Sequence, residues 1–104
     1  MNRGEIWQFG FGKPDRRRPV LLLTRQEMIG RLETVTVAPL TRTIRGVPSE
    51  VVVGTECGLK TQSAINLHNV ATVPRSGLHS FVGTVPPAVL AAVGESLLFA
   101  LGFD

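Results

Sequence analysis

An uninterrupted aliphatic run near the N-terminus constrains the fold of this chain more than any other feature. Residues 19–24, PVLLLT, contain no polar side chain before Thr24. Neighbouring side chains of a strand point to opposite faces of its sheet, so such a run predicts a strand that is buried on both sides. The chain is therefore expected to place this segment in the middle of a sheet and not at its edge.

The segments around this run have the patterns of further strands. Residues 4–9, GEIWQF, put Trp7 and Phe9 on one face. Residues 33–40, ETVTVAPL, alternate cleanly until Pro39, which cannot donate to a strand ladder. Three more strands are predicted over residues 49–54, 63–73 and 80–85, and RQEMIGR at 25–31 is predicted to form a helical turn or a loop.

The last segment changes to helical periodicity. Pro86 and Pro87 suit the start of a helix, and apolar residues then recur at helical spacing, at Leu90, Val93, Leu97 and Leu101. Residues 86–101 contain only two polar side chains, those of Glu95 and Ser96. Because one face of this helix is enough to cover the sheet, the rest predicts contact with a second copy of the chain, or alternatively with another protein.

The order of these elements predicts the fold class. Strands followed by one terminal helix are typical of a small α+β protein, mostly β, that is built on a curled antiparallel sheet. The 104 residues show no internal repeat and no linker, so we expect a single domain over 1–104. Such a fold is compatible with many activities, and the function must be argued from particular residues.

The cysteine count and the hydropathy pattern predict a soluble cytoplasmic protein. Cys57 is the only cysteine, which excludes an intramolecular disulfide and a cysteine-based zinc site within one chain. The N-terminal MNRGEIWQF lacks the apolar core of a signal peptide. The most apolar stretch, PPAVLAAVGESLLFALGF, is too short for a membrane span and is interrupted by polar residues.

Basic residues are confined to one part of the chain. All 11 lysines and arginines lie from Arg3 to Arg75, whereas residues 76–104 contain only Glu95 and Asp104 as charged groups. This distribution predicts a phosphate-binding face beside an uncharged element. Three consecutive arginines, Arg16 to Arg18, directly precede the apolar strand, where they form either a solvated loop or an anion site.

Five segments together resemble the MazF/PemK/Kid family of toxins. They are RGEIW at 3–7, RRPVLLLT at 17–24, TVTVAPLTRTIRGVPSEV at 34–51, GLK at 58–60 and INLHNVATV at 65–73, in the order and spacing of that family. The resemblance implies a distorted SH3-like barrel and a homodimer. It also implies an endoribonuclease that cuts single-stranded RNA at short motifs without metal or other cofactor, and a cognate antitoxin as partner.

The implied reaction suits the residue types at two positions. RNA cleavage without a metal uses the 2′-hydroxyl to attack the adjacent phosphate, and positioned cationic donors stabilise the phosphorane. Arg18 occupies the family's catalytic arginine position, and Thr41, directly after APL, occupies its catalytic threonine position. From the residues alone, Arg18 could instead pair with Glu5 or Glu33, and Thr41 could be an ordinary turn hydroxyl.

Further residues are candidates for contacts with RNA. The arginines expected to bind phosphates without reading sequence are Arg16, Arg17, Arg42 and Arg45. Lys13, Thr43 and Asn66 are further candidates. Phe11, which is flanked by glycines, is a candidate for base stacking, whereas Trp7 is expected in the core.

His68 is a possible catalytic residue. On a continuous strand over 63–73, Asn66 and His68 point the same way, so both could face the RNA. A histidine with an unperturbed pKa of about 6.5 can exchange protons near neutral pH. The alternative is a surface or interface histidine without a catalytic role.

Two other functions stay open from the sequence. A CcdB-like toxin has the same fold but binds gyrase and cuts nothing, and a nonenzymatic RNA-binding barrel would keep the basic face without needing Thr41. The combination of Arg18 with Thr41 favours the nuclease, because a protein-binding surface does not need both.

Overall fold

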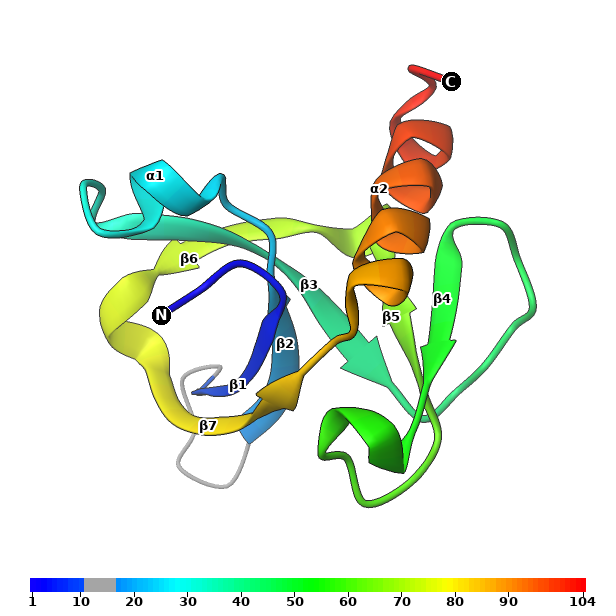
Figure 1. Ribbon diagram of the computed structural model, residues 1–104, viewed down its shortest axis with the longest axis horizontal. Helices are drawn as coiled ribbons and strands as arrows, with labels where there is room; N and C mark the ends of the chain where they lie inside the picture. The colour runs from blue at the N-terminus through cyan, green and yellow to red at the C-terminus, as the bar shows by residue number, and fades with distance from the viewer. Residues whose placement is uncertain (11–16) are drawn as a thin grey trace.

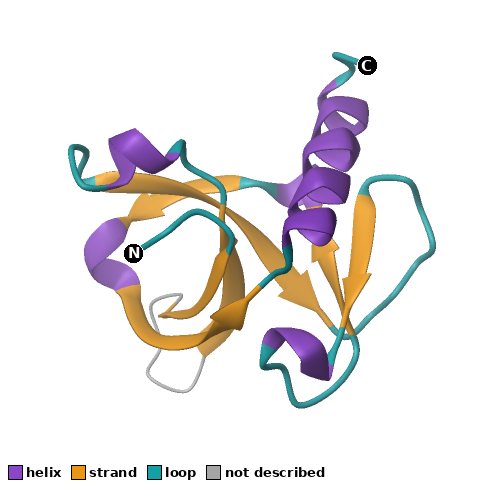
Figure 2. Cartoon of the chain, viewed as in Figure 1, coloured by secondary structure: helices purple, strands orange, loops and turns teal. Residues whose placement is uncertain are grey.

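The computed structural model describes residues 1–10 and 17–104, which form a curled antiparallel sheet and a C-terminal helix (Figures 1 and 2). The strands are β1 (Glu5–Gly10), β2 (Arg17–Leu22), β3 (Thr34–Thr41), β4 (Glu50–Val53), β5 (Ser63–Asn66), β6 (Ala71–Pro74) and β7 (Leu78–Thr84). The α-helices are α1 (Gln26–Ile29) and α2 (Pro87–Leu101), and three short 3₁₀ helices span Thr55–Cys57, Leu67–Asn69 and Arg75–Gly77. Three of the RNA-binding candidates, Phe11, Lys13 and Arg16, lie outside the described residues. In the part of the chain that the structure describes, no helix is long and apolar enough to cross a membrane.

Strand β3 connects the two parts of the sheet. The larger part has the order β6-β3-β2-β1-β7, and the smaller part has the order β4-β5-β3. The sheet curls strongly but is not closed, because none of the described pairings joins β6 to β7. The predicted mostly-β fold with a curled antiparallel sheet and a terminal helix is confirmed.

Strand β2 is buried on both faces, as its sequence predicts. Val20 and Leu22 point into a core inside the curl of the sheet, which we call the inner core; its members are Phe9, Val20, Leu22, Ile29, Val35, Val37, Val73 and Leu78. Leu21 and Leu23 point into a second core, the helix core, between the sheet and α2. Each of these four side chains is less than 9% exposed, so both sides of the strand exclude water.

Trp7 packs against other residues of the fold. It is half-buried against the inner core, on the same side of β1 as Phe9, which confirms the predicted common face. Its ring meets the ring of Phe81 edge-on at a centroid distance of 5.8 Å, and its Nε1 donates to Glu5 Oε1 over 3.0 Å. Burial acts to raise the pKa of Glu5, but hydrogen bonds from Asn2 and Trp7 outweigh it and hold that pKa below its ordinary value.

The prediction of one continuous strand over 63–73 is wrong. Both β5 and β6 pair with β3, with Leu40 opposite Ile65 and Val37 opposite Ala71. From the first pair to the second, β3 advances by three residues, whereas the segment from β5 to β6 advances by six. The surplus residues form a 3₁₀ turn, Leu67–Asn69, between β5 and β6. The turn carries Leu67 into the helix core, where it is fully buried. Burial of one leucine therefore interrupts a strand that the apolar pattern predicts as continuous.

Helix α2 begins where the sequence predicts. Pro87 is its first residue, and Gly102 ends it in the left-handed conformation at φ 77°. Val93 is buried in the helix core, and Leu90 and Leu97 pack against that core. The end of the helix stands away from the sheet (Figure 1). Leu101 there is 55% exposed, so the fourth predicted apolar position does not contact the core.

Gly83 of β7 allows another segment to pass close to the sheet, and its replacement tests this contact. A Cβ at Gly83 would collide with the carbonyl oxygen of Cys57 and would lie 2.7 Å from its carbonyl carbon. Gly83→Ala should therefore lower the free energy of unfolding by about 1–3 kcal/mol, as expected for overpacking. Denaturant unfolding measures this loss.

Gly94→Ala is the matched control for this prediction. A Cβ at Gly94, inside α2, meets no atom within 4 Å apart from the adjacent backbone of the helix itself. The substitution should leave stability unchanged or raise it by up to about 1 kcal/mol, because alanine favours a helix interior over glycine. Equal stabilities of Gly83→Ala and the wild-type chain would contradict the close approach.

Candidate active site

The pairing of β2 with β3 brings Arg18 and Thr41 together. Val20 lies opposite Pro39 in this antiparallel pair, and the same register continued by two residues leads from Val20 to Arg18 and from Pro39 to Thr41. Both side chains line the same two grooves. Arg18 is exposed at the start of a strand whose following residues are buried, which fixes its backbone and leaves its guanidinium in solvent. The structure thus places both predicted catalytic residues at one point of the surface.

Two grooves meet at this point. The first groove has a volume of about 780 Å³, and the second has a volume of about 500 Å³. Both are lined by Arg18, Leu40, Thr41 and Thr43. The other residues of the first groove are Gln8, Arg17, Pro19, Arg42, Gly58, Leu59, Lys60, Thr61, Ser63, Ser80, Phe81 and Val82. The other residues of the second groove are Pro39, Arg45, Asn66 and Asn69.

The hydroxyl of Thr41 has a defined orientation. Its Oγ1 accepts a hydrogen bond from the backbone N–H of Thr43 over 3.1 Å. This is the turn interaction that the sequence offers as an alternative to catalysis. Because a hydroxyl has one hydrogen as well as two lone pairs, Thr41 can accept this bond and still donate its own hydrogen to an oxygen in the grooves. The two roles are compatible.

The loop after Thr41 is held by a single carboxylate. Glu50 Oε1 accepts from the backbone N–H groups of Arg45 and Gly46 over 3.0 and 2.9 Å. Gly46 has φ 73°, a conformation that glycine adopts without strain. These bonds fix the backbone of the loop, so the exposed side chain of Arg45 is presented at the second groove.

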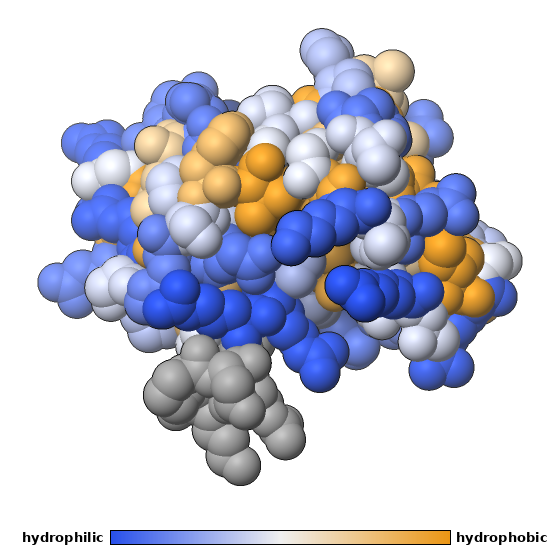
Figure 3. Space-filling view, turned by 90° about the horizontal axis from the view of Figure 1, so that it is seen from below, coloured by the Kyte–Doolittle hydropathy of each residue, from blue (hydrophilic) through white to orange (hydrophobic). Residues whose placement is uncertain are grey.

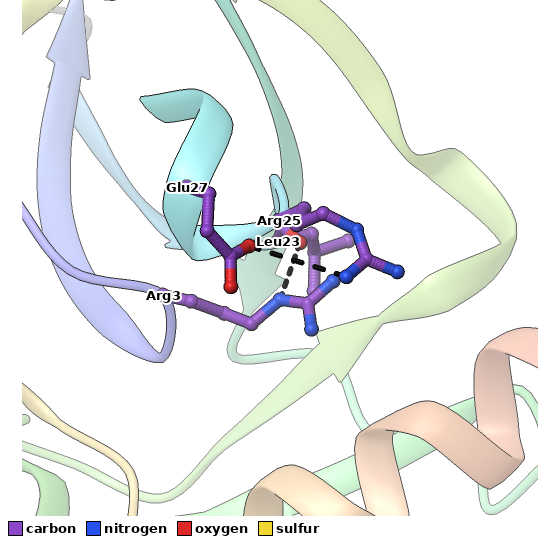
Figure 4. A network of polar contacts seen from close by, with 4 residues as sticks. All are labelled: Arg3, Leu23, Arg25 and Glu27. Atoms are coloured by element: carbon purple, nitrogen blue, oxygen red, sulfur yellow. Dashed lines mark hydrogen bonds and ion pairs between the residues drawn. The ribbon is translucent and has the colours of Figure 1, made fainter. Parts of the chain in front are cut away.

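Some arginines are used to hold the fold. Arg3 Nε donates to the carbonyl oxygen of Leu23 over 2.8 Å, and Arg25 lies 4.0 Å from the carboxylate of Glu27 (Figure 4). Arg75 Nη1 donates in the same way to the carbonyl oxygen of Ile29 over 2.6 Å. Arg3 and Arg75 thus hold the segment between β2 and β3, whereas the pair of Arg25 with Glu27 is exposed to solvent and contributes little.

The basic side chains at the grooves, unlike those of Arg3 and Arg75, make no hydrogen bond or ion pair within the described residues. Within residues 1–10 and 17–104, the pair Arg25–Glu27 is the one ion pair, so Arg18 does not pair with Glu5 or Glu33. The other basic side chains of the first groove are those of Arg17, Arg42 and Lys60. Figure 3, a view from below Figure 1, shows strongly hydrophilic side chains in a band across that face. Unpaired cations around a hydroxyl donor form a site suited to a polyanion.

His68 lies in the 3₁₀ turn and not on a strand. Its Nδ1 is hydrogen-bonded to Ser49 Oγ over 2.7 Å, and its backbone N–H donates to Asn66 Oδ1 over 3.2 Å. The expectation that His68 and Asn66 point the same way along a strand is therefore wrong, because the turn redirects the chain between them. Asn66 lines the second groove, whereas His68 is absent from the walls of both grooves.

The described residues offer this site neither a reactive thiol nor a cluster of metal ligands. Burial, together with the charge of Glu56, raises the pKa of the Cys57 thiol and keeps it protonated. Across the described ranges, no three His, Cys, Asp or Glu side chains gather to hold a metal ion. The site is thus built from arginine, lysine, hydroxyl and amide groups.

The family model for PemK-like, MazF-like toxins of type II toxin–antitoxin systems matches residues 2–101. The chain belongs to this toxin family. Endoribonuclease MazF3 of Mycobacterium tuberculosis is 38% identical over 86 residues, which cover 79% of this chain and 84% of that protein. The predicted MazF/PemK membership is confirmed.

Solved structures of MazF-like toxins agree with the fold. Mycobacterium tuberculosis toxin MazF-mt6 superposes with a TM-score of 0.87 at 34% identity, covering 96% of this chain and 98% of that one. An endoribonuclease from a mycobacterial species, solved in complex with its cognate antitoxin, superposes with a TM-score of 0.88 at 25% identity, covering 100% and 97%.

Sequence reasoning missed one wall of the first groove in this MazF-like chain. Lys60 is part of the GLK segment, yet no pattern along the chain connects it with Arg18. The connection is made by Gly58, which passes so close to Val82 and Gly83 of β7 that a Cβ would collide there. This approach lays the loop carrying Lys60 beside the ends of β1 and β2. Asn69, Gln8 and Ser80 were missed for the same reason, since only tertiary packing brings them to the grooves.

Proposed function

We propose that this chain is the toxin of a toxin–antitoxin pair and acts as an endoribonuclease on single-stranded RNA. The observation that carries the proposal is the position of Arg18 beside Thr41, where two grooves meet whose cations have no ion-pair partner among the described residues. The similarity to the endoribonuclease MazF3 supports it. A cytoplasmic location, expected from the sequence, stays a prediction.

The proposed chemistry needs no metal. The RNA 2′-hydroxyl loses its proton and attacks the adjacent phosphate, which becomes a phosphorane. The bond to the 5′-oxygen then breaks, leaving a 2′,3′-cyclic phosphate, and the 5′-oxygen takes up a proton, so that no proton is gained or lost overall. The forked guanidinium of Arg18 contacts two oxygens of the phosphorane, and Thr41 donates its free hydrogen to one of them. Arg17, Arg42 and Lys60 hold the neighbouring phosphates in the first groove. A role of His68 in proton transfer stays a prediction.

The catalytic roles are tested by substitution at the two central residues. Arg18→Ala and Thr41→Ala should each lower the cleavage rate by about 10²-fold or more, because each removes one preorganised donor. Arg18→Lys should also fail, since an ammonium group cannot make the forked contact. Single-turnover cleavage of a long single-stranded RNA, with EDTA present, measures the rates.

The control and the product ends separate the proposal from its alternatives. Arg31→Ala removes an exposed arginine that lines neither groove and should leave the rate unchanged. Products should carry 2′,3′-cyclic phosphate and 5′-hydroxyl ends. Binding without cleavage would favour the nonenzymatic RNA-binding barrel, and no effect on RNA would favour the CcdB-like toxin. Full activity of Arg18→Ala would overturn the assignment.

We also propose that the chain is a homodimer with α2 in its interface. The exposed apolar side chains at the end of the chain are those of Leu98, Phe99, Leu101 and Phe103, which are 49%, 47%, 55% and 76% exposed. Apolar side chains gathered in this way are typical of an interface. A second copy presents the same surface, so an interface with two-fold symmetry covers both sets at once.

Leu101→Asp tests the dimer, because Leu101 is exposed while Leu97 packs against the helix core. Leu101→Asp should weaken association by about tenfold or more and leave the monomer folded, since it places a charge in an apolar interface. Sedimentation velocity at micromolar concentration measures the change. Leu32→Asp, at an exposed leucine outside α2, is the control. A wild-type chain that sediments as a monomer would overturn the proposal.

The proposed antitoxin is an acidic, extended segment that lies across Arg16–Arg18 and Arg42–Arg45. The surface that attracts RNA phosphates also attracts carboxylates, and the apolar atoms of the grooves add affinity. The mycobacterial endoribonuclease solved in complex with its cognate antitoxin supports an antitoxin as partner.

Charge reversal tests where the antitoxin binds. Arg17→Glu combined with Arg45→Glu should weaken antitoxin binding by at least about tenfold in titration calorimetry, because attraction becomes repulsion at both grooves. Arg31→Glu is the control: one such substitution changes the net charge by the same amount as either of these two, but Arg31 lines neither groove. It should have little effect on antitoxin binding. Unchanged affinity of the double variant would place the antitoxin elsewhere.

A further inference from the structure

The loop between β3 and β4 carries residues of the grooves but has no regular structure of its own. It spans residues 42–49 and runs out beside the sheet before it returns to β4 (Figure 1). Residues 42–48 are all exposed, and residues 43–47 belong to no helix or strand. Thr43 and Arg45 nevertheless line the second groove. Their side chains can keep defined positions there only if specific bonds hold the loop.

Within the described residues, two side chains make the hydrogen bonds that hold the middle of this loop. At its start, Thr41 Oγ1 accepts from the backbone N–H of Thr43 over 3.1 Å. Further along, Glu50 Oε1 accepts from the N–H groups of Arg45 and Gly46 over 3.0 and 2.9 Å. Only one residue separates these two sets of bonds, so the position of Thr43 depends on Glu50 as well as on Thr41.

Glu50 is itself fixed by the sheet. It lies opposite Asn66 in the antiparallel pair of β4 with β5, and β5 pairs in turn with β3. Its backbone N–H donates to the carbonyl oxygen of Val47 over 3.1 Å, which closes the end of the loop on the strand. A carboxylate mounted on a strand can set the position of a loop that forms no strand itself.

Glu50 is a poor choice for stability alone. In the part of the chain that the structure describes, its Oε2 is the one fully buried side-chain N or O atom without a hydrogen-bond partner. Burial of an unpaired polar atom costs free energy. The N–H groups that Oε1 accepts from belong to exposed residues, so water could bond to them instead. The carboxylate therefore contributes more to the shape of the loop than to the stability of the fold.

The shape of the loop determines how the hydroxyl of Thr41 is used. While the Thr43 N–H occupies one lone pair of Oγ1, the side chain keeps one orientation and the hydroxyl hydrogen points away from Thr43. That hydrogen is then available to an oxygen in the grooves, as the proposed reaction requires. If the loop moved, water would bond to the Thr43 N–H and the side chain of Thr41 would be free to turn.

We propose that Glu50 is a positioning residue for the cleavage reaction. Through the β3–β4 loop it holds the Thr43 N–H at Thr41 Oγ1, and in this way it orients the Thr41 hydroxyl toward the reacting phosphate. Glu50 lines neither groove, so it acts through Thr41 and not on RNA. This inference rests on the proposed ribonuclease function and extends it to a residue outside both grooves.

A double-mutant cycle with Thr41 tests this role. Glu50→Met keeps the length of the side chain but removes both oxygens, and it should lower the single-turnover cleavage rate at saturating RNA by about tenfold. In the Thr41→Ala background no hydroxyl is left to orient, so the same change should alter the rate by less than about twofold. A residue that only stabilised the fold would lower the rate equally in both backgrounds.

Two further variants and a stability measurement separate this role from charge and from folding. Glu50→Gln retains a carbonyl oxygen for the two N–H groups, so it should keep more of the rate than Glu50→Met. Glu33→Met removes the same charge from an exposed residue that lines neither groove, and it should leave the rate unchanged. In thermal unfolding, Glu50→Met should be as stable as the wild-type chain or more stable, because the unpaired Oε2 is gone.

Amide hydrogen exchange, followed by NMR, tests the same link without RNA. Glu50→Met should speed exchange of the Thr43 N–H by about fivefold, the effect of weakening one hydrogen bond, although Glu50 makes no bond to Thr43. The control is the Leu23 N–H, which donates to Thr36 in the sheet and should exchange at an unchanged rate.

The outcomes distinguish this inference from the proposed function. A wild-type chain that does not cut RNA refutes the ribonuclease and, with it, any role of Glu50 in cleavage. Cleavage by the wild-type chain, with equal losses from Glu50→Met in both Thr41 backgrounds, refutes the positioning role alone. Unchanged exchange of the Thr43 N–H in Glu50→Met refutes it as well. Coupled rates together with faster exchange at Thr43 support it.

Discussion

The burial of β2 on both faces is the constraint on which the rest of the structure depends. Four consecutive aliphatic side chains alternate between the inner core and the helix core, so neither side of the strand can be left to solvent. The curled sheet with α1 closes one side, and α2 with the smaller part of the sheet closes the other. Arg18 begins this strand, and its backbone position is therefore set by two cores at once. A charged group mounted in this way can be placed accurately without being buried.

The arginines of this chain fall into two groups, those that donate to backbone carbonyl groups and those that line the grooves. Arg3 and Arg75 donate to backbone carbonyl groups, and these bonds tie the segment around α1 to the sheet. These bonds hold both guanidinium groups against the backbone, and neither side chain lines a groove. The arginines at the grooves have no such partner within the described residues, so they remain available to phosphates. Net charge alone does not distinguish the two groups, but their hydrogen bonds do.

Much of the fold follows from local patterns, and the site follows only partly. The double burial of β2 and the start and end of α2 are encoded by continuous apolar residues, prolines and a glycine, each of which acts on its own neighbours. The turn after Asn66 cannot be predicted in this way, because Leu67 is buried in a core whose other residues come from distant parts of the chain. For the same reason, the pairing of Arg18 with Thr41 is predictable from family motifs, while Lys60 reaches the groove through the contact of Gly58 with β7. The position of His68 could not be predicted from the strand pattern, because the 3₁₀ turn Leu67–Asn69 changes the direction of the chain there.

The attachment of the β3–β4 loop has a consequence for how this chain can diversify. Glu50 holds the loop through the N–H groups of residues 45 and 46. Every amino acid except proline offers this N–H, so the anchor does not depend on which side chain stands at position 45. Mutation can therefore exchange that side chain while the loop keeps its shape. Substitutions at position 45 can therefore change the chemistry that the second groove presents, while Glu50 keeps the frame that presents Thr41.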